Sequence, residues 1–186
     1  QAFHQSISRT DWWESSPGLG LERIFQKHMG RAATPLELES WKAHYGRLVA
    51  KGHIKLIRGV RPFIRRLTRQ GKKLAVATSG SRIQAVSLLQ YHHLNALFLV
   101  VVGQEDIGAN KCLAYQQAAA RLGELTSACC AIEDSPAGIV AAKQAGVGRI
   151  VGLATTLQRD FLKHAHPDYV ASSYHDLREW LSRSRP

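Results

Sequence analysis

Two adjacent carboxylates, Glu133 and Asp134, follow a short apolar run and stand directly before Ser135 and Pro136. The run, residues 128–132, is short and bounded, which is typical of a buried strand. A serine N-cap and a proline at the first helical position predict a helix after it. Ligands bind at the carboxyl ends of parallel strands, and carboxylate oxygens suit a hard cation such as Mg²⁺. Taken alone, however, a solvated acidic pair at a helix N-terminus explains the pattern more simply.

Two other predicted strand ends carry polar groups. Thr78, Ser79 and Gly80 follow a strand and precede a helix, so their hydroxyls and backbone N–H groups could hold an anion. Lys111 stands in a loop that opens a later helix. Taken one at a time, N-capping and a solvated surface charge explain these residues. Together, hydroxyl, lysine and paired carboxylates are the set needed to handle a phosphate with Mg²⁺.

The elements that must position these groups alternate between helix and strand from residue 60 onward. Apolar strands that alternate with helices predict a doubly wound parallel sheet covered on both faces, hence an α/β fold. The predicted strands span residues 73–78, 97–102, 128–132, 149–153 and 169–171. The predicted helices span residues 60–70, 82–90, 113–122, 137–145, 158–164 and 174–182.

Residues 1–57 have a different pattern, helical throughout and without a strand. Thr34, Pro35 and Glu37 form a capping box with proline at the first helical position. The segment is too short to bury a large core of its own. We therefore expect a helical module over residues 1–57 and an α/β core over residues 58–186.

Composition narrows the partners and the compartment. The 186 residues carry a net charge of +11, which favours anionic partners such as phosphorylated metabolites. Arg61, Arg65 and Arg69 form a helical stripe that could bind nucleic acid, although a solvated helix face is the favoured interpretation. Cys129 and Cys130 adjoin on a strand that looks buried, and the third cysteine leaves an odd number, which indicates a reducing, cytoplasmic setting. The longest apolar run is too short to span a membrane, and no signal peptide is visible.

The region from about residue 60 to 170 resembles the haloacid dehalogenase (HAD) superfamily, in the branch of phosphoglycolate phosphatase and β-phosphoglucomutase. Residues 75–80 match its second motif, Lys111 falls at its third, and residues 133–138 match its fourth. The resemblance implies Mg²⁺-dependent hydrolysis of a small phosphomonoester. It implies that Thr78, Ser79 and Lys111 bind the phosphate, with Gly80 in the same turn. It also implies that Asp134 and Glu133 bind Mg²⁺. Residues 1–57 resemble the branch's helical cap, which makes Arg23 a weak candidate for substrate contact.

Two departures qualify this resemblance. Lys111 continues into Cys112 rather than into the usual proline-containing segment. More importantly, no Asp-x-Asp occurs among the 186 residues, whereas the family carries its nucleophile and its general acid/base in that motif on a first, central strand. Because the chain also begins with Gln1, we expect a truncated chain that is inactive alone. The alternative is a non-catalytic scaffold that binds anions or nucleic acid.

The lost strand has a consequence for the fold. Without it, the strands at 73–78 and 128–132 would each have an unpaired inner edge. We expect these edges either to close on each other or to recruit a strand from elsewhere.

Overall fold

The structure is a computed structural model that describes residues 21–108 and 110–183. The chain divides into two compact units, Gln1–Lys55 and Leu56–Pro186. In the described part of the first unit, helices α2 (Leu21–Met29) and α3 (Pro35–Ala50) are present. The capping box predicted at the start of α3 is confirmed, because Thr34 Oγ1 accepts from Glu37 N and the Glu37 carboxylate accepts from Thr34 N. That residues 1–57 act as a substrate-selecting cap stays a prediction.

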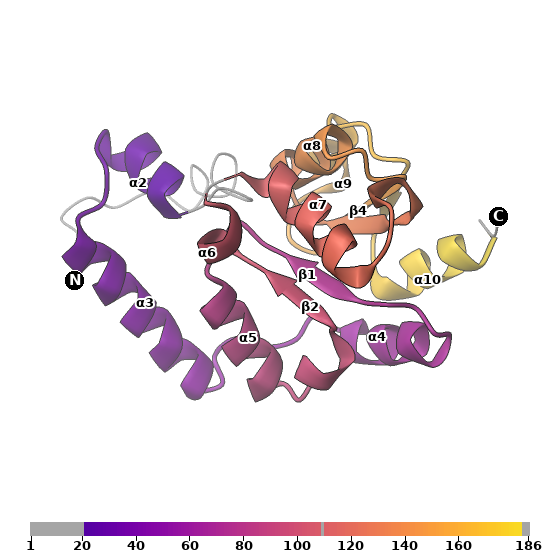
Figure 1. Cartoon of the computed structure of the whole chain (residues 1–186), viewed down its shortest axis with the longest axis horizontal. Helices are drawn as coiled ribbons and strands as arrows, with labels where there is room; N and C mark the ends of the chain where they lie inside the picture. The colour runs from indigo at the N-terminus through magenta and orange to yellow at the C-terminus, as the bar shows by residue number, and fades with distance from the viewer. Residues whose placement is uncertain (1–20, 109, 184–186) are drawn as a thin grey trace. The chain divides into compact units, whose positions relative to one another are not determined.

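The second unit alternates helices and strands (Figure 1). Its strands are β1 (Ala75–Ala77), β2 (Val100–Val102), β3 (Cys130–Glu133), β4 (Arg149–Leu153) and β5 (Tyr169–Ala171). Its α-helices are α4 (Val60–Arg69), α5 (Arg82–Tyr91), α6 (Gln104–Ile107), α7 (Lys111–Leu122), α8 (Pro136–Gln144), α9 (Arg159–Lys163) and α10 (Tyr174–Arg183).

The strands form two parallel sheets, β1-β2 and β3-β4-β5. The predicted α/β class with parallel strands is therefore confirmed, although the described strands form two sheets and not one. Three predicted strands began too early, because β1, β2 and β3 start at Ala75, Val100 and Cys130. Short 3₁₀ turns at Asn95–Leu97 and Thr126–Ala128 precede two of them. The short helix α6 was not predicted.

Helices cover the strands from both sides. On one side, α7, α8 and α9 enclose a core that includes Tyr115, Ile139 and Leu162. On the other side, α4 and α10 pack on a second core with Phe63 and Leu177. In Figure 1, β1 and β2 accordingly run between α7 and α4.

The inner strands β1 and β3 do not pair with each other in the described part of the chain. This outcome agrees with the unpaired inner edges expected from the sequence. One sequence interpretation was wrong at the same place. Cys130 looked buried, but it is exposed at the edge of β3 that has no partner strand in the described part of the chain.

Candidate active site

The turn from β3 to α8 exposes one acidic residue and buries the other. Ser135 is fully buried, and its Oγ accepts a hydrogen bond of 3.2 Å from Gly138 N, which caps α8 as predicted. Pro136 takes the first helical position. Asp134 is exposed, whereas Glu133 keeps only 7% of its surface accessible. The two adjacent carboxylates therefore have different environments.

Lys111 contacts Glu133 directly. Lys111 is the first residue of α7 rather than a loop residue, because Asn110 caps the helix by accepting from Cys112 N and Leu113 N. Its Nζ lies 2.9 Å from Glu133 Oε2, and the two side chains are 15% and 8% exposed. A charge as buried as that of Glu133 needs a partner, and Lys111 supplies it.

Tyr115 engages the other oxygen of Glu133. It lies one turn after Lys111 on the same helix face, and its hydroxyl donates its single hydrogen to Glu133 Oε1, with the carbonyl of Gly138 3.3 Å from the hydroxyl oxygen. Burial and the neighbouring carboxylate charge raise the pKa of the Tyr115 phenol far above its usual value, so it remains a donor. Sequence reasoning missed Tyr115, although its position four residues after Lys111 was the available signal.

Gly138 makes this arrangement possible because it has no side chain. A Cβ at this position would lie 1.8 Å from Glu133 Oε2 and 3.0 Å from Lys111 Nζ. Helix α8 can therefore approach the Glu133 carboxylate closely only with glycine here.

The turn after β1 is held by its own hydrogen bonds. Thr78 Oγ1 accepts from Gly80 N at 3.0 Å, and Ser81 rather than Ser79 caps α5. Ser81 Oγ also donates to Glu105 Oε1 at 2.6 Å, while Glu105 Oε2 accepts from the backbone N of Arg82. Glu105 lies in α6 and thus fixes the turn that carries Thr78, Ser79 and Gly80.

Helix α7 relates this turn to the Lys111–Glu133 pair. Its first residue, Lys111, contacts the carboxyl end of β3, and near its last turn the Leu122 carbonyl accepts from Lys73 Nζ at the start of β1. Because α7 runs antiparallel to both strands, β1 and β3 run in the same direction. Thr78 and Asp134 therefore both lie at carboxyl ends, on the side where α7 begins.

The residues available for a metal are fewer than the sequence suggested. Both oxygens of Glu133 have partners, which leaves Asp134 as the exposed carboxylate of this turn. Within residues 21–108 and 110–183, no group of three or more His, Cys, Asp or Glu residues could hold a metal ion. One carboxylate still fits Mg²⁺, which usually keeps several waters and binds through one or two carboxylates and a substrate phosphate.

Arg23 lies apart from these residues in the chain. It is exposed on α2, in the first compact unit. Its contact with substrate stays a prediction.

A parallel α/β unit with a buried lysine–glutamate pair at its strand ends has the form of a ligand-binding enzyme fold. Residues 3–146 match the family model "Hydrolase: haloacid dehalogenase-like hydrolase". The chain belongs to this family.

Curated relatives and solved structures agree with this assignment. The chain is 30% identical over 146 residues to the bifunctional riboflavin kinase/FMN phosphatase of Arabidopsis thaliana, covering 72% of this chain and 38% of that protein. It is 26% identical to protein CbbY of Rhodobacter capsulatus, covering 79% and 74%. CbbY of Rhodobacter sphaeroides, solved with phosphate, is 27% identical with a TM-score of 0.75, covering 94% and 82%. A Pseudomonas syringae hydrolase of the same fold is 20% identical with a TM-score of 0.79, covering 97% and 86%.

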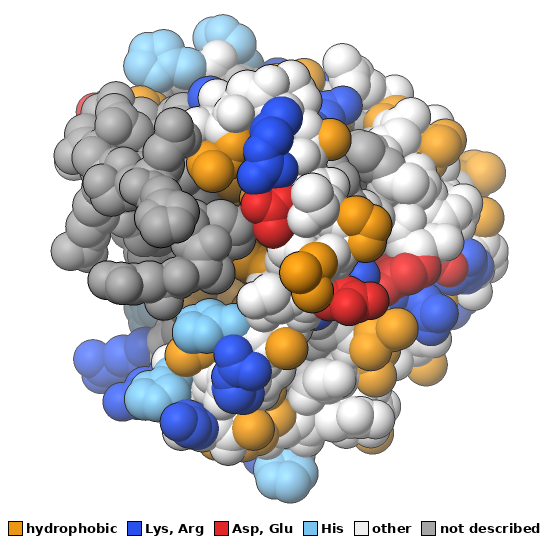
Figure 2. Space-filling model, turned by 90° about the vertical axis from the view of Figure 1, so that its left-hand side faces the viewer, with side chains coloured by type: hydrophobic (Ala, Val, Ile, Leu, Met, Phe, Trp, Pro, Cys, Tyr) orange, Lys and Arg blue, Asp and Glu red, His pale blue; other side chains and the backbone are white. Residues whose placement is uncertain are grey.

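Two further observations concern the charged side chains on the surface and the length of the helices. On the face drawn in Figure 2, Lys and Arg side chains are interspersed with acidic, histidine and apolar ones. No helix among the described residues is long and apolar enough to cross a membrane.

Proposed function

We propose that this chain provides the phosphate-holding side of a Mg²⁺-dependent phosphomonoesterase for small phosphorylated metabolites. The observation that carries the proposal is the buried pair of Lys111 and Glu133 beside the exposed carboxylate of Asp134. An HAD-like phosphatase family and a relative solved with phosphate support it.

Each residue has a role that follows from its contacts. Lys111 is held by Glu133, and Glu133 by Tyr115, so the ammonium group is oriented before substrate arrives. Its remaining N–H bonds would donate to the phosphate oxygens. The hydroxyl groups of Thr78 and Ser79 would complete the phosphate contacts, with Gly80 keeping the turn tight.

Asp134 would hold Mg²⁺, whose bound charge neutralises the phosphate during transfer. Glu133 contributes indirectly, as the residue that positions Lys111. Because no Asp-x-Asp occurs among the 186 residues, the nucleophile of the family reaction must come from elsewhere. The chain alone is then expected to bind phosphate with Mg²⁺ but not to hydrolyse phosphomonoesters.

Phosphate binding tests this proposal separately from turnover. Titration of the chain with inorganic phosphate, with and without Mg²⁺, should show saturable binding by calorimetry. Lys111→Met should weaken it about 10- to 100-fold, since a charge-assisted contact contributes about 1.5–3 kcal/mol. Lys73→Met, which alters a lysine at the opposite end of α7, is the matched control. Equal loss in both variants would favour general attraction to the basic surface, as in a non-catalytic anion-binding scaffold.

A further inference from the structure

The basic residues of this chain are not spread evenly along the sequence. Residues 40–104 contain twelve of the 25 lysine and arginine residues but none of the 14 aspartate and glutamate residues. Within this stretch, residues 58–69 carry five arginines and no lysine. This richest part coincides with helix α4 and the two residues before it. A charge asymmetry of this kind indicates a basic patch rather than a uniformly charged surface.

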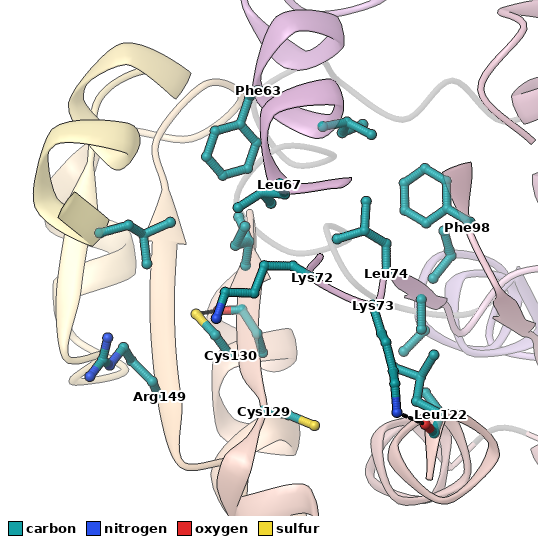
Figure 3. A pocket seen from close by; sticks show the side chains of 18 of the residues that line it. Phe63, Leu67, Lys72, Lys73, Leu74, Phe98, Leu122, Cys129, Cys130 and Arg149 are labelled. Atoms are coloured by element: carbon teal, nitrogen blue, oxygen red, sulfur yellow. Dashed lines mark hydrogen bonds between the residues drawn. The ribbon is translucent and has the colours of Figure 1, made fainter. Parts of the chain in front are cut away.

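One side of α4 packs in the protein interior, and another side carries a row of arginines. Phe63 is buried, and Phe63 and Leu67 point from α4 into the space between the strands that Figure 3 draws. Arg65 and Arg69 are exposed and Arg61 is half-buried, and the three follow one another at i, i+4 and i+8. An α-helix rises about 1.5 Å per residue, so this α4 arginine row is about 12 Å long. The packed side of the helix holds the row at a fixed spacing.

The α4 arginine row has no acidic partner within residues 21–108 and 110–183. None of the salt bridges found there involves an arginine of the row. Helix α10 lies beside α4 (Figure 1), but its acidic side chains have other partners. Asp176 accepts from the Tyr169 hydroxyl at 2.6 Å, and Glu179 Oε2 lies 3.9 Å from Arg183 Nη2. The positive charge of the row is therefore available to an external anion.

The form of the row favours an anion that repeats at regular intervals. The planar guanidinium group donates two hydrogen bonds to one phosphate, which suits arginine to nucleic-acid backbones. Phosphates follow one another at about 3.4 Å along the axis of each duplex strand, so the row spans about three to four nucleotides. An acidic protein segment has no such fixed repeat. Helices that lie on membranes insert an apolar side, whereas none of the exposed large hydrophobic side chains among the described residues lies on α4.

We propose that the α4 arginine row binds the phosphate backbone of a nucleic acid. Contacts to the backbone carry no sequence information, so binding is independent of base sequence. It falls steeply as salt rises, because each neutralised phosphate releases counterions. A solvated helix face, the simpler interpretation of the same arginines, predicts no binding that depends on this row. The inference does not rest on the proposed phosphatase function.

Fluorescence anisotropy of a short labelled duplex DNA of mixed sequence tests the proposal. Saturable binding should appear with a Kd of about 10⁻⁴–10⁻⁶ M at physiological salt, the range of non-specific DNA binding. The combined change Arg61→Gln, Arg65→Gln and Arg69→Gln should weaken binding about 10-fold or more. It should also lower the slope of log K against log salt by about 2.7, since each phosphate contact contributes about 0.9. Changing the same three residues to lysine keeps the charges and should retain most of the binding.

A matched control removes three cations that already have acidic partners. Changing Arg121, Arg159 and Lys163 to glutamine lowers the net charge by the same amount, but each of these side chains pairs with an aspartate. This variant should keep the affinity and the salt slope nearly unchanged, and circular dichroism checks that both variants fold. Equal weakening by both variants would mean general attraction to a basic chain and would overturn the proposal. So would the absence of saturable DNA binding, or tighter binding to vesicles that contain phosphatidylserine than to DNA.

Discussion

Lys111 Nζ lies 2.9 Å from Glu133 Oε2, and the side chains of Lys111 and Glu133 are 15% and 8% exposed, respectively. The Tyr115 hydroxyl donates to the other carboxylate oxygen, Oε1. The carboxylate predicted as a metal ligand is thus engaged by two side chains of α7. Asp134 remains the exposed carboxylate of this turn, and the orientation of Lys111 depends on Glu133.

Glu133→Gln should destabilise the second unit by about 1–3 kcal/mol, because it leaves the Lys111 charge without its counter-ion in a buried place. The matched control is Glu124→Gln, which breaks the exposed pair with Lys73, 46% and 40% exposed, and should cost under about 1 kcal/mol. Urea unfolding followed by tryptophan fluorescence measures both, since Trp180 lies in the second unit. Equal costs would show that the Lys111–Glu133 pair has no special weight.

Gly138→Ala should displace the Glu133 carboxylate, because the added methyl would lie 1.8 Å from Oε2. Overpacking of this kind costs about 1–3 kcal/mol, and phosphate binding should weaken with it. Gly46→Ala in α3, where nothing lies within 4 Å of the new methyl, should instead be neutral or slightly stabilising. Calorimetric phosphate titration of both variants checks this, and undiminished binding by Gly138→Ala would contradict the role given to Glu133.

Tyr115→Phe should lower stability by about 1.5–3 kcal/mol, since a hydrogen bond to a charged group is lost in a buried site. Tyr169→Phe removes another hydroxyl–carboxylate bond, of 2.6 Å, to Asp176, whose side chain is 30% exposed. That control should cost less in the same unfolding experiment. If the order is reversed, Tyr115 does not anchor Glu133.

Cys130 gives a pH-dependent signal for the open edge of β3. Its thiol lines the space between β1 and β3, and desolvation there raises the pKa of the thiol to about 11. The thiolate is the reactive form, so alkylation should accelerate about tenfold per pH unit from pH 7 to 10, where a thiol of ordinary pKa already levels off. Because the folded chain holds this proton more tightly than the unfolded one, rising pH through 9 to 11 should also reduce stability. A rate in a Cys112→Ser, Cys129→Ser variant that levels off near pH 8.5 would contradict the assignment.

Sequence reasoning reached the fold and the chemical types better than the contacts. Residues 149–153 and 169–171 were predicted as strands to the residue, because apolar runs between turn residues admit little else. The prediction that Glu133 binds metal came from adjacency to Asp134, but adjacent strand residues point to opposite sides, and only tertiary packing showed Lys111 and Tyr115 beside Glu133. Cys130 was misjudged for a related reason, since its burial depends on a neighbouring strand and not on its own run.

Phosphomonoester hydrolysis by the purified chain, with and without an added peptide, tests the central claim most directly. The peptide carries about five apolar residues followed by Asp-x-Asp, the motif that the family has on its first strand, and a control peptide carries Asn-x-Asn instead. Across a panel of sugar phosphates, phosphoglycolate and flavin mononucleotide with Mg²⁺, the chain alone should remain at background. The Asp-x-Asp peptide should restore turnover, and the Asn-x-Asn peptide should not, because loss of a covalent nucleophile typically costs about 10⁴- to 10⁶-fold. Asp134→Asn should also abolish turnover, because it removes the carboxylate proposed to hold Mg²⁺. Robust Mg²⁺-dependent turnover by the chain without peptide, or none with a peptide that hydrogen exchange shows to be bound, would contradict the account.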